Sequence, residues 1–107
     1  MDLKHYTYRV IWSEEDQEHV GLCTEFPSLS WLDSDVAGAL RGIMQVVAAA
    51  ASDMQANGET LPLPMSERQF SGRFAVRVPP MIHRKLAAEA AEKGVSMNRL
   101  VSAKLAM

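Results

Sequence analysis

The stretch SGRFAVRVPP, residues 71–80, decides how the end of the chain folds. Three apolar residues alternate there with three basic or small ones. We name the first set the ribbon core row and the second the ribbon outer row: Phe74, Val76 and Val78, and Arg73, Ala75 and Arg77. A period of two is typical of a strand, predicted over residues 72–78, with one apolar face and one largely basic face.

Two helices are predicted after this strand. Pro80 suits a first helical turn, where its missing N–H costs nothing, so we expect a helix over residues 80–93. Gly94 ends that helix, and Ser96 can cap a second one over residues 96–106.

A lone strand leaves its backbone groups unpaired, and the simplest partner is a second copy of the chain. In an antiparallel pair the ribbon core row faces the helices as the dimer core. The ribbon outer row then faces outward. A two-stranded ribbon fits the DNA major groove, and arginine is the commonest reader of guanine edges, so the outer row is predicted to face bases. The amides of Ser96, Met97 and Asn98 lie at a positive helix end suited to phosphate.

The N-terminal part predicts a small α+β domain. Residues 6–12 alternate with Tyr6, Tyr8, Val10 and Trp12 on one face. Residues 19–26 place Val20, Leu22, Thr24 and Phe26 on one face and Cys23 on the other. A short third strand over residues 29–32, a helix capped by residues 33–35 and a stop at Asn57–Gly58 follow, then an extended piece and a linker. We therefore expect domains at residues 1–66 and 70–107.

The charge is divided unevenly along the 107 residues. Residues 70–107 carry seven cations and two anions, whereas residues 1–69 carry four cations and eleven anions. A compact basic segment favours nucleic acid as a partner. The single cysteine excludes an internal disulfide and favours a reducing compartment. With neither a signal peptide nor a membrane span in the pattern, we expect a cytoplasmic protein.

Residues 72–101 resemble a ribbon-helix-helix DNA-binding domain, through the alternating strand, its proline, and the spacing of Gly94, Ser96 and Asn98. The resemblance implies the same base-facing and phosphate-binding positions and a dimer. Ala75 departs from the usual polar reader, so a hydrogen bond to a base is absent at that position.

Residues 8–32, above all the motif EFPSL at Glu25–Leu29, resemble the HicB antitoxin family. That resemblance implies a partial ribonuclease H-like domain joined to a DNA-binding domain that dimerises. It implies a role in silencing a HicA-type toxin, an mRNA-cleaving ribonuclease, and in repressing the shared promoter on double-stranded operator DNA. The assembly is then a homodimer or a higher even-numbered oligomer.

The sequence is also compatible with other interpretations. Arg73 and Arg77 can be ordinary solvated charges. The whole chain can be a stand-alone regulator whose N-terminal domain senses a ligand. The acidic residues 14–18 lie in one local turn, which favours a solvated loop over a nuclease centre with converging carboxylates. Glu25 and this turn are candidates for contact with a basic toxin. The histidines and Cys23 match no zinc spacing, so we expect no metal and no cofactor. Because no carboxylates converge, we also expect no enzyme activity.

Overall fold

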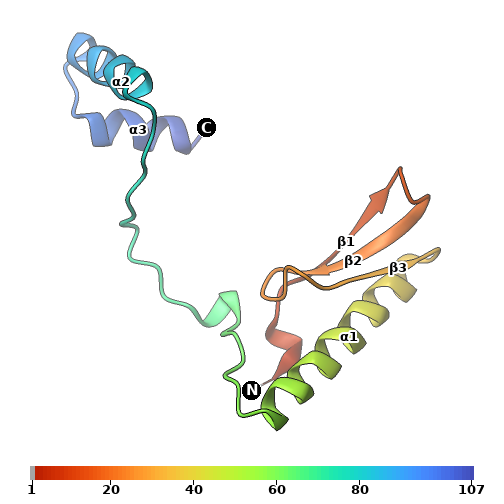
Figure 1. The fold of residues 1–107 in the computed structure, drawn as a ribbon. Coiled ribbons are helices and arrows are strands. Elements are labelled where there is room, and N and C mark those ends of the chain that lie inside the picture. Colours follow the sequence, from red (N-terminus) through yellow and green to blue (C-terminus); the bar gives the residue numbers. More distant parts are fainter. Residues whose placement is uncertain (1) are drawn as a thin grey trace. The chain divides into compact units, whose positions relative to one another are not determined.

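The computed structural model describes residues 2–107 as two compact units. The first unit ends at Phe70, and the second is Ser71–Met107. The first holds three strands and a long helix, and the second holds two helices (Figure 1). This arrangement confirms the predicted α+β class, with antiparallel strands followed by helices.

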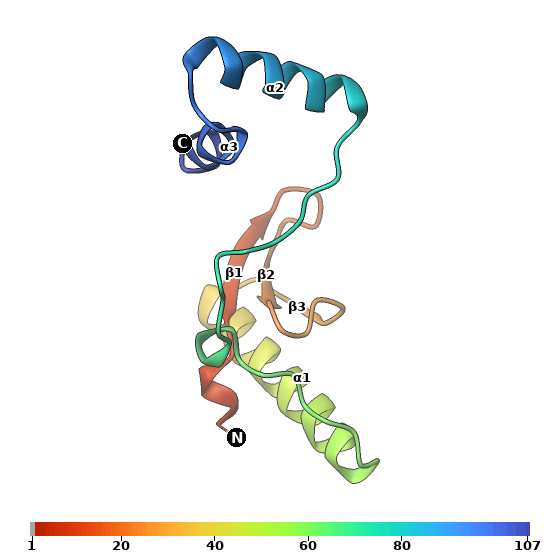
Figure 2. The ribbon, with the colours of Figure 1, turned by 90° about the vertical axis from the view of Figure 1, so that its left-hand side faces the viewer.

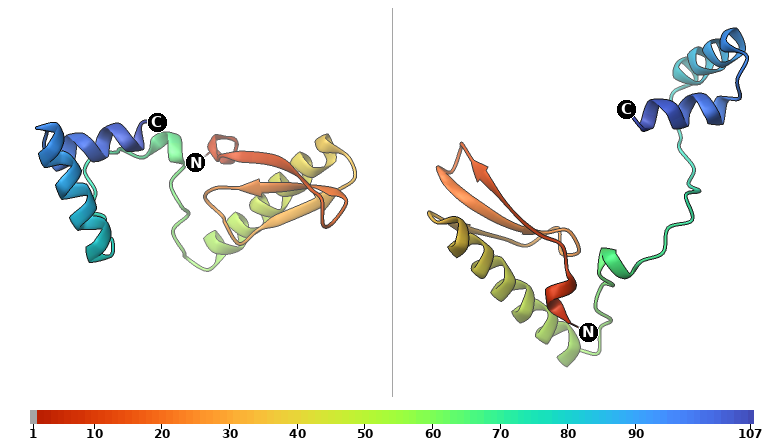
Figure 3. Two further views of the ribbon diagram at one scale, coloured as in Figure 1. Left: turned by 90° about the horizontal axis from the view of Figure 1, so that it is seen from above. Right: turned by 180° about the vertical axis from the view of Figure 1, so that it is seen from behind.

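The sheet of the first unit has the strand order β1-β2-β3, with both neighbouring pairs antiparallel. The strands are β1 (Tyr8–Ser13), β2 (Glu18–Cys23) and β3 (Ser30–Asp33). A single turn of 3-10 helix, η1 (Leu3–His5), precedes them. The helix α1 (Val36–Ala56) lies along one face of this sheet (Figures 1 and 3).

The ends of α1 follow the predicted signals. The Asp35 carboxylate accepts a hydrogen bond of 3.1 Å from the Gly38 amide and caps the first turn. The helix stops at Asn57, and Gly58 follows with a φ of 73°, a backbone conformation that favours glycine.

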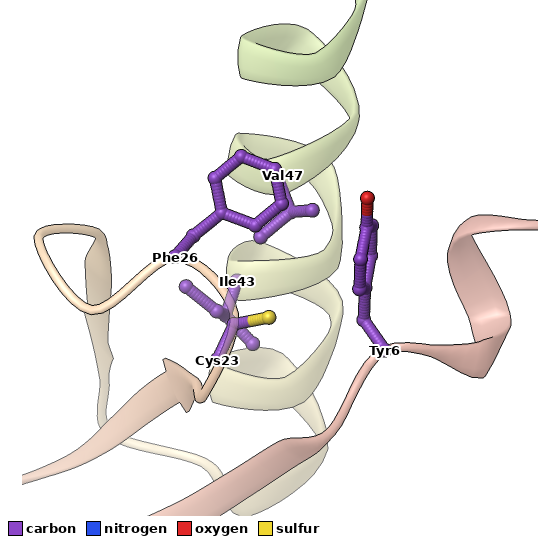
Figure 4. Packing of buried hydrophobic residues seen from close by; sticks show 5 residues of the cluster. All are labelled: Tyr6, Cys23, Phe26, Ile43 and Val47. Atoms are coloured by element: carbon purple, nitrogen blue, oxygen red, sulfur yellow. The ribbon is translucent and has the colours of Figure 1, made fainter. Parts of the chain in front are cut away.

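The core lies between α1 and the sheet, and its buried residues are Tyr6, Cys23, Phe26, Ile43 and Val47 (Figure 4). The rings of Tyr6 and Phe26 meet edge to face, with their centroids 5.3 Å apart. Such a pair adds attraction beyond the burial of its apolar area.

The apolar row of the second predicted strand, with Val20 and Leu22, is not the face of β2 that packs against α1. Gly21 and Cys23 face α1, whereas Val20 and Leu22 lie on the opposite face of the sheet. A Cβ atom on Gly21 would lie 2.8 Å from a side-chain carbon of Ile43, so only glycine allows the helix this close. Phe26 reaches the core because β2 ends at Cys23 and the chain turns.

The extended piece after α1 does not add a fourth strand. Pro62 and Pro64 have no N–H to donate to a ladder, and this segment is fixed by side chains instead. The Tyr6 hydroxyl donates to the Pro62 carbonyl at 2.7 Å, and Pro64 is fully buried. A short 3-10 turn, η2 (Met65–Glu67), follows.

The second unit contains α2 (Pro80–Lys93) and α3 (Met97–Leu105), close to the predicted helices. Gly94 ends α2 with a φ of 66°, and Ser96 caps α3 by accepting from the Arg99 amide at 3.1 Å. Figure 2 shows α2 along its length and α3 nearly end-on, so the two helices cross. Ala90 and Leu100 are buried.

Candidate functional site

The predicted ribbon, residues 72–78, has no assigned strand structure in the single chain. A strand is recognised by its ladder of hydrogen bonds to a second strand, and within residues 2–107 this segment pairs with none. The pairing with a second copy therefore stays a prediction.

The ribbon core row is exposed in the single chain. The exposed fractions are 73% for Phe74, 66% for Val76 and 38% for Val78. The same segment lines one side of a groove of about 880 Å³ within the second unit, and Leu86, Met97 and Val101 are among the residues of the helices that line it. One copy of the second unit thus leaves much of its apolar surface uncovered.

The ribbon outer row is exposed as well. Among residues 2–107, neither Arg73 nor Arg77 takes part in an ion pair, so both guanidinium groups can meet a ligand. Elsewhere in the unit, Glu89 pairs with Lys93 at 3.1 Å and with Lys104 at 3.2 Å, which ties α3 to α2.

The three predicted phosphate-binding residues lie together at the start of α3. Ser96 is the N-cap, and Met97 and Asn98 are the first two helical residues. The first amides of a helix have no carbonyl partner within the helix, so they can donate to an external oxygen. Phosphate binding at this position stays a prediction.

Glu25 is buried, with 8% of its surface exposed, which sequence reasoning missed. Its carboxylate accepts from the Met65 amide at 2.8 Å, from the Thr7 amide at 2.9 Å and from the Thr7 hydroxyl at 3.0 Å. The thiol of Cys23 lies 3.6 Å from the same carboxylate. Glu25 therefore holds residue 65 against the sheet, and its carboxylate is not free to meet a toxin.

The pKa values of this cluster follow from burial and hydrogen bonding. Burial is the largest influence on Glu25 and opposes its ionisation. The hydrogen bonds from Met65 and Thr7 act together against burial and lower the pKa of Glu25 below its ordinary value. Burial raises the pKa of the Cys23 thiol, so it stays protonated and unreactive near neutral pH.

The acidic turn between β1 and β2 is exposed at Glu14, Glu15 and Asp16. Its hydrogen bonds are local, as between the hydroxyl of Ser13 and Asp16 at 2.9 Å. In the described part of the chain, no three His, Cys, Asp or Glu residues come together to hold a metal ion. No helix among these residues is long and apolar enough to cross a membrane.

The HicB family model matches residues 56–105, just under half of the chain. The matched part begins at the last residue of α1 and runs to the end of α3. This match supports membership of the HicB family, and the EFPSL motif at Glu25–Leu29 lies outside it. No curated protein and no solved structure matches the chain.

Proposed function

We propose that the chain is the antitoxin of a type II toxin–antitoxin system. The first unit binds and neutralises a HicA-type mRNA-cleaving toxin. The second unit dimerises, binds operator DNA and represses the operon that encodes both proteins. The match to the HicB family supports the antitoxin role.

The uncovered ribbon core row is the observation that carries the DNA-binding part of the proposal. Neighbouring exposed apolar side chains of this kind mark interaction surfaces. A second copy offers the same alternating segment, so two copies together can form an antiparallel ribbon and bury both rows over their helices. The two ribbon outer rows then lie side by side and present four arginines to one surface.

The toxin-binding part of the proposal rests on charge and on the family. Residues 1–69 carry eleven anions and four cations, which suits a small basic protein and repels nucleic acid. The two tasks thus fall to parts of the chain with opposite charge.

Two substitutions in the ribbon separate its two roles. Arg77→Ala removes an exposed charge and leaves the proposed dimer core untouched, so dimerisation stays intact. Operator binding weakens by about 1–3 kcal/mol for each arginine removed from a base edge, and a dimer holds two copies. Val76→Ala removes apolar surface from the proposed dimer core, so it lowers dimer stability first.

For each variant we measure the affinity for operator DNA and for unrelated DNA at matched salt. We also measure the mass of the assembly and the rescue of growth during toxin expression. Arg84→Ala is the matched control, because it removes the same charge from α2. We expect only Arg77→Ala to lower the ratio of operator to unrelated affinity, with toxin rescue unchanged. An unchanged ratio for Arg77→Ala would remove the ribbon from operator recognition.

A further inference from the structure

The sheet of the first unit has one face that α1 does not cover (Figures 1 and 3). Ile11 pairs with Val20, and Val20 pairs with Leu32, so three branched apolar residues cross this face in one line. We name this line the outward sheet row. Leu22 lies on the same face beside it, opposite Arg9 and Ser30.

The outward sheet row is open to solvent. Ile11 is 47% exposed and Leu32 is 45% exposed, while Val20 between them is half-buried by its neighbours. A sheet with one solvated face normally carries polar residues there. An apolar line on that face therefore indicates a surface that a partner covers.

The surroundings of the outward sheet row specify the charge of the partner. At one end lies the exposed acidic turn with Glu14, Glu15 and Asp16, and Glu18 lies on the same face. The strands themselves contain one Lys or Arg, Arg9, which lies at the end away from the turn. An apolar centre with an acidic rim complements a partner with an apolar centre and a basic rim.

The charge argues against other occupants. A second copy of this unit carries the same excess of seven anions, so two such faces repel each other. Nucleic acid and anionic lipid are repelled for the same reason. A small basic protein is the class of partner that both the apolar row and its rim favour.

The sheet face alone is too small for a stable interface, so the contact with a partner must also include the acidic rim. Three strands at about 4.8 Å spacing place Ile11 and Leu32 roughly 10 Å apart, and six residues of strand extend roughly 20 Å. A stable interface needs about 800 Å² on each partner, which is more than the sheet face alone offers. The acidic turn at the end of the face is the adjoining surface of suitable charge.

We propose that the outward sheet row, with the acidic turn at its rim, is the surface on which the basic toxin docks. This inference rests on the proposed antitoxin function and adds where on the first unit the contact lies. In it, Ile11 and Leu32 are the apolar centre of the contact. The acidic turn and Glu18 steer the toxin and fix its orientation.

The test uses the full chain and the basic toxin encoded beside it, carried as a catalytically inactive variant, with binding measured by calorimetry. Leu32→Lys and Ile11→Lys each place a like charge at the centre of the proposed contact. Leu40→Lys is the matched control, since Leu40 is 40% exposed on α1 and the substitution changes the net charge equally. Because all three side chains are exposed, the fold is expected to survive, and tryptophan fluorescence verifies this.

We expect Leu32→Lys and Ile11→Lys to weaken toxin binding at least about tenfold, and Leu40→Lys to change it less than about twofold. Glu18→Gln weakens binding by less, and its effect shrinks as salt is added. If both sheet variants bind the toxin as tightly as the wild type does, the proposed docking surface is wrong, but the proposed antitoxin function is unaffected. Failure of the wild type to bind at all refutes that function itself. If the sheet variants, measured without toxin, form an assembly of different mass from that of the wild type, this face binds a second copy of the chain. That result also overturns the proposal.

Discussion

Replacing Glu25 with glutamine tests whether one buried carboxylate holds the first unit together. The substitution keeps the size of the side chain and removes one acceptor oxygen. In the wild type the backbone amides of Thr7 and Met65 donate to different oxygens of Glu25, at 2.9 and 2.8 Å. Whichever way the new amide turns, one of these two backbone donors meets an N–H group instead of an acceptor.

The cost follows from these contacts. A hydrogen bond to a charged group contributes roughly 1.5–3 kcal/mol, and the remaining bonds become weaker because their acceptor is now neutral. We therefore expect Glu25→Gln to lower the free energy of unfolding by roughly 2–4 kcal/mol at pH 7. For a domain of this size, that corresponds to a fall in Tm of roughly 8–30 °C.

The assay is urea unfolding followed by tryptophan fluorescence. Both tryptophans, Trp12 and Trp31, lie in the first unit, so the signal reports that unit alone. Glu15→Gln is the matched control, because Glu15 is an exposed residue of the acidic turn. We expect the control to stay within about 0.5 kcal/mol of the wild type. A Glu25→Gln protein equally close to the wild type would refute the role of this carboxylate.

The pH dependence of this difference has a definite sign. The pKa of Glu25 is lowered in the folded chain, so its charge stabilises the fold at pH values above the ordinary pKa of glutamate. That stabilisation is lost as the pH falls through the lowered pKa of the folded state. The gap between wild type and Glu25→Gln is therefore full at pH 7 and shrinks in acid. A gap that grows in acid would contradict the assignment.

Two further substitutions test the packing of each unit. Gly21→Ala places a methyl group against the Ala39 carbonyl of α1, and we expect it to destabilise the first unit by roughly 1–3 kcal/mol in the same urea assay. Ser96→Ala removes the acceptor for the Arg99 amide, so we expect a destabilisation of roughly 1 kcal/mol in the unfolding of α2 and α3, followed by circular dichroism. An unchanged midpoint in either case would contradict the packing or the cap described.

Local chemistry explains why much of the fold could be predicted from the sequence. Asp35, Gly58, Gly94 and Ser96 each act within a few residues of their own position, and each begins or ends the helix that the sequence predicts. Alternation likewise predicted the first two strands. These signals need no knowledge of distant parts of the chain.

The inner face of β2 could not be predicted in the same way. Apolar residues occur on both faces of that strand, so a period of two does not say which face α1 covers. The choice depends on Gly21, where the absence of a side chain lets α1 approach, and on Cys23, which behaves as a small apolar residue. A pattern based on large apolar side chains selects Val20 and Leu22 instead.

The role of Glu25 was missed because its partner lies 40 residues away in the sequence. A glutamate among apolar residues gives no sign of which amides it will meet. The bond to Met65 has a structural consequence, because it keeps the chain fixed on the first unit past Pro64, which is itself buried. The chain thus stays fixed on the first unit through the 3-10 turn Met65–Glu67 and at Arg68, which donates to the Leu63 carbonyl at 2.8 Å, later than the prolines alone suggest.

The two units differ in how much of their apolar surface a single chain buries. In the first unit, α1 covers one sheet face, Glu25 fixes the following segment, and the core of Ile43 and Val47 is closed within a single copy. In the second unit, the helices bury Ala90 and Leu100 but leave the ribbon core row uncovered. Burial of that row by a second copy makes the stability of the second unit depend on protein concentration, whereas that of the first does not. Under the proposed function, a single chain can therefore neutralise a toxin at concentrations where too few dimers exist to repress the operon.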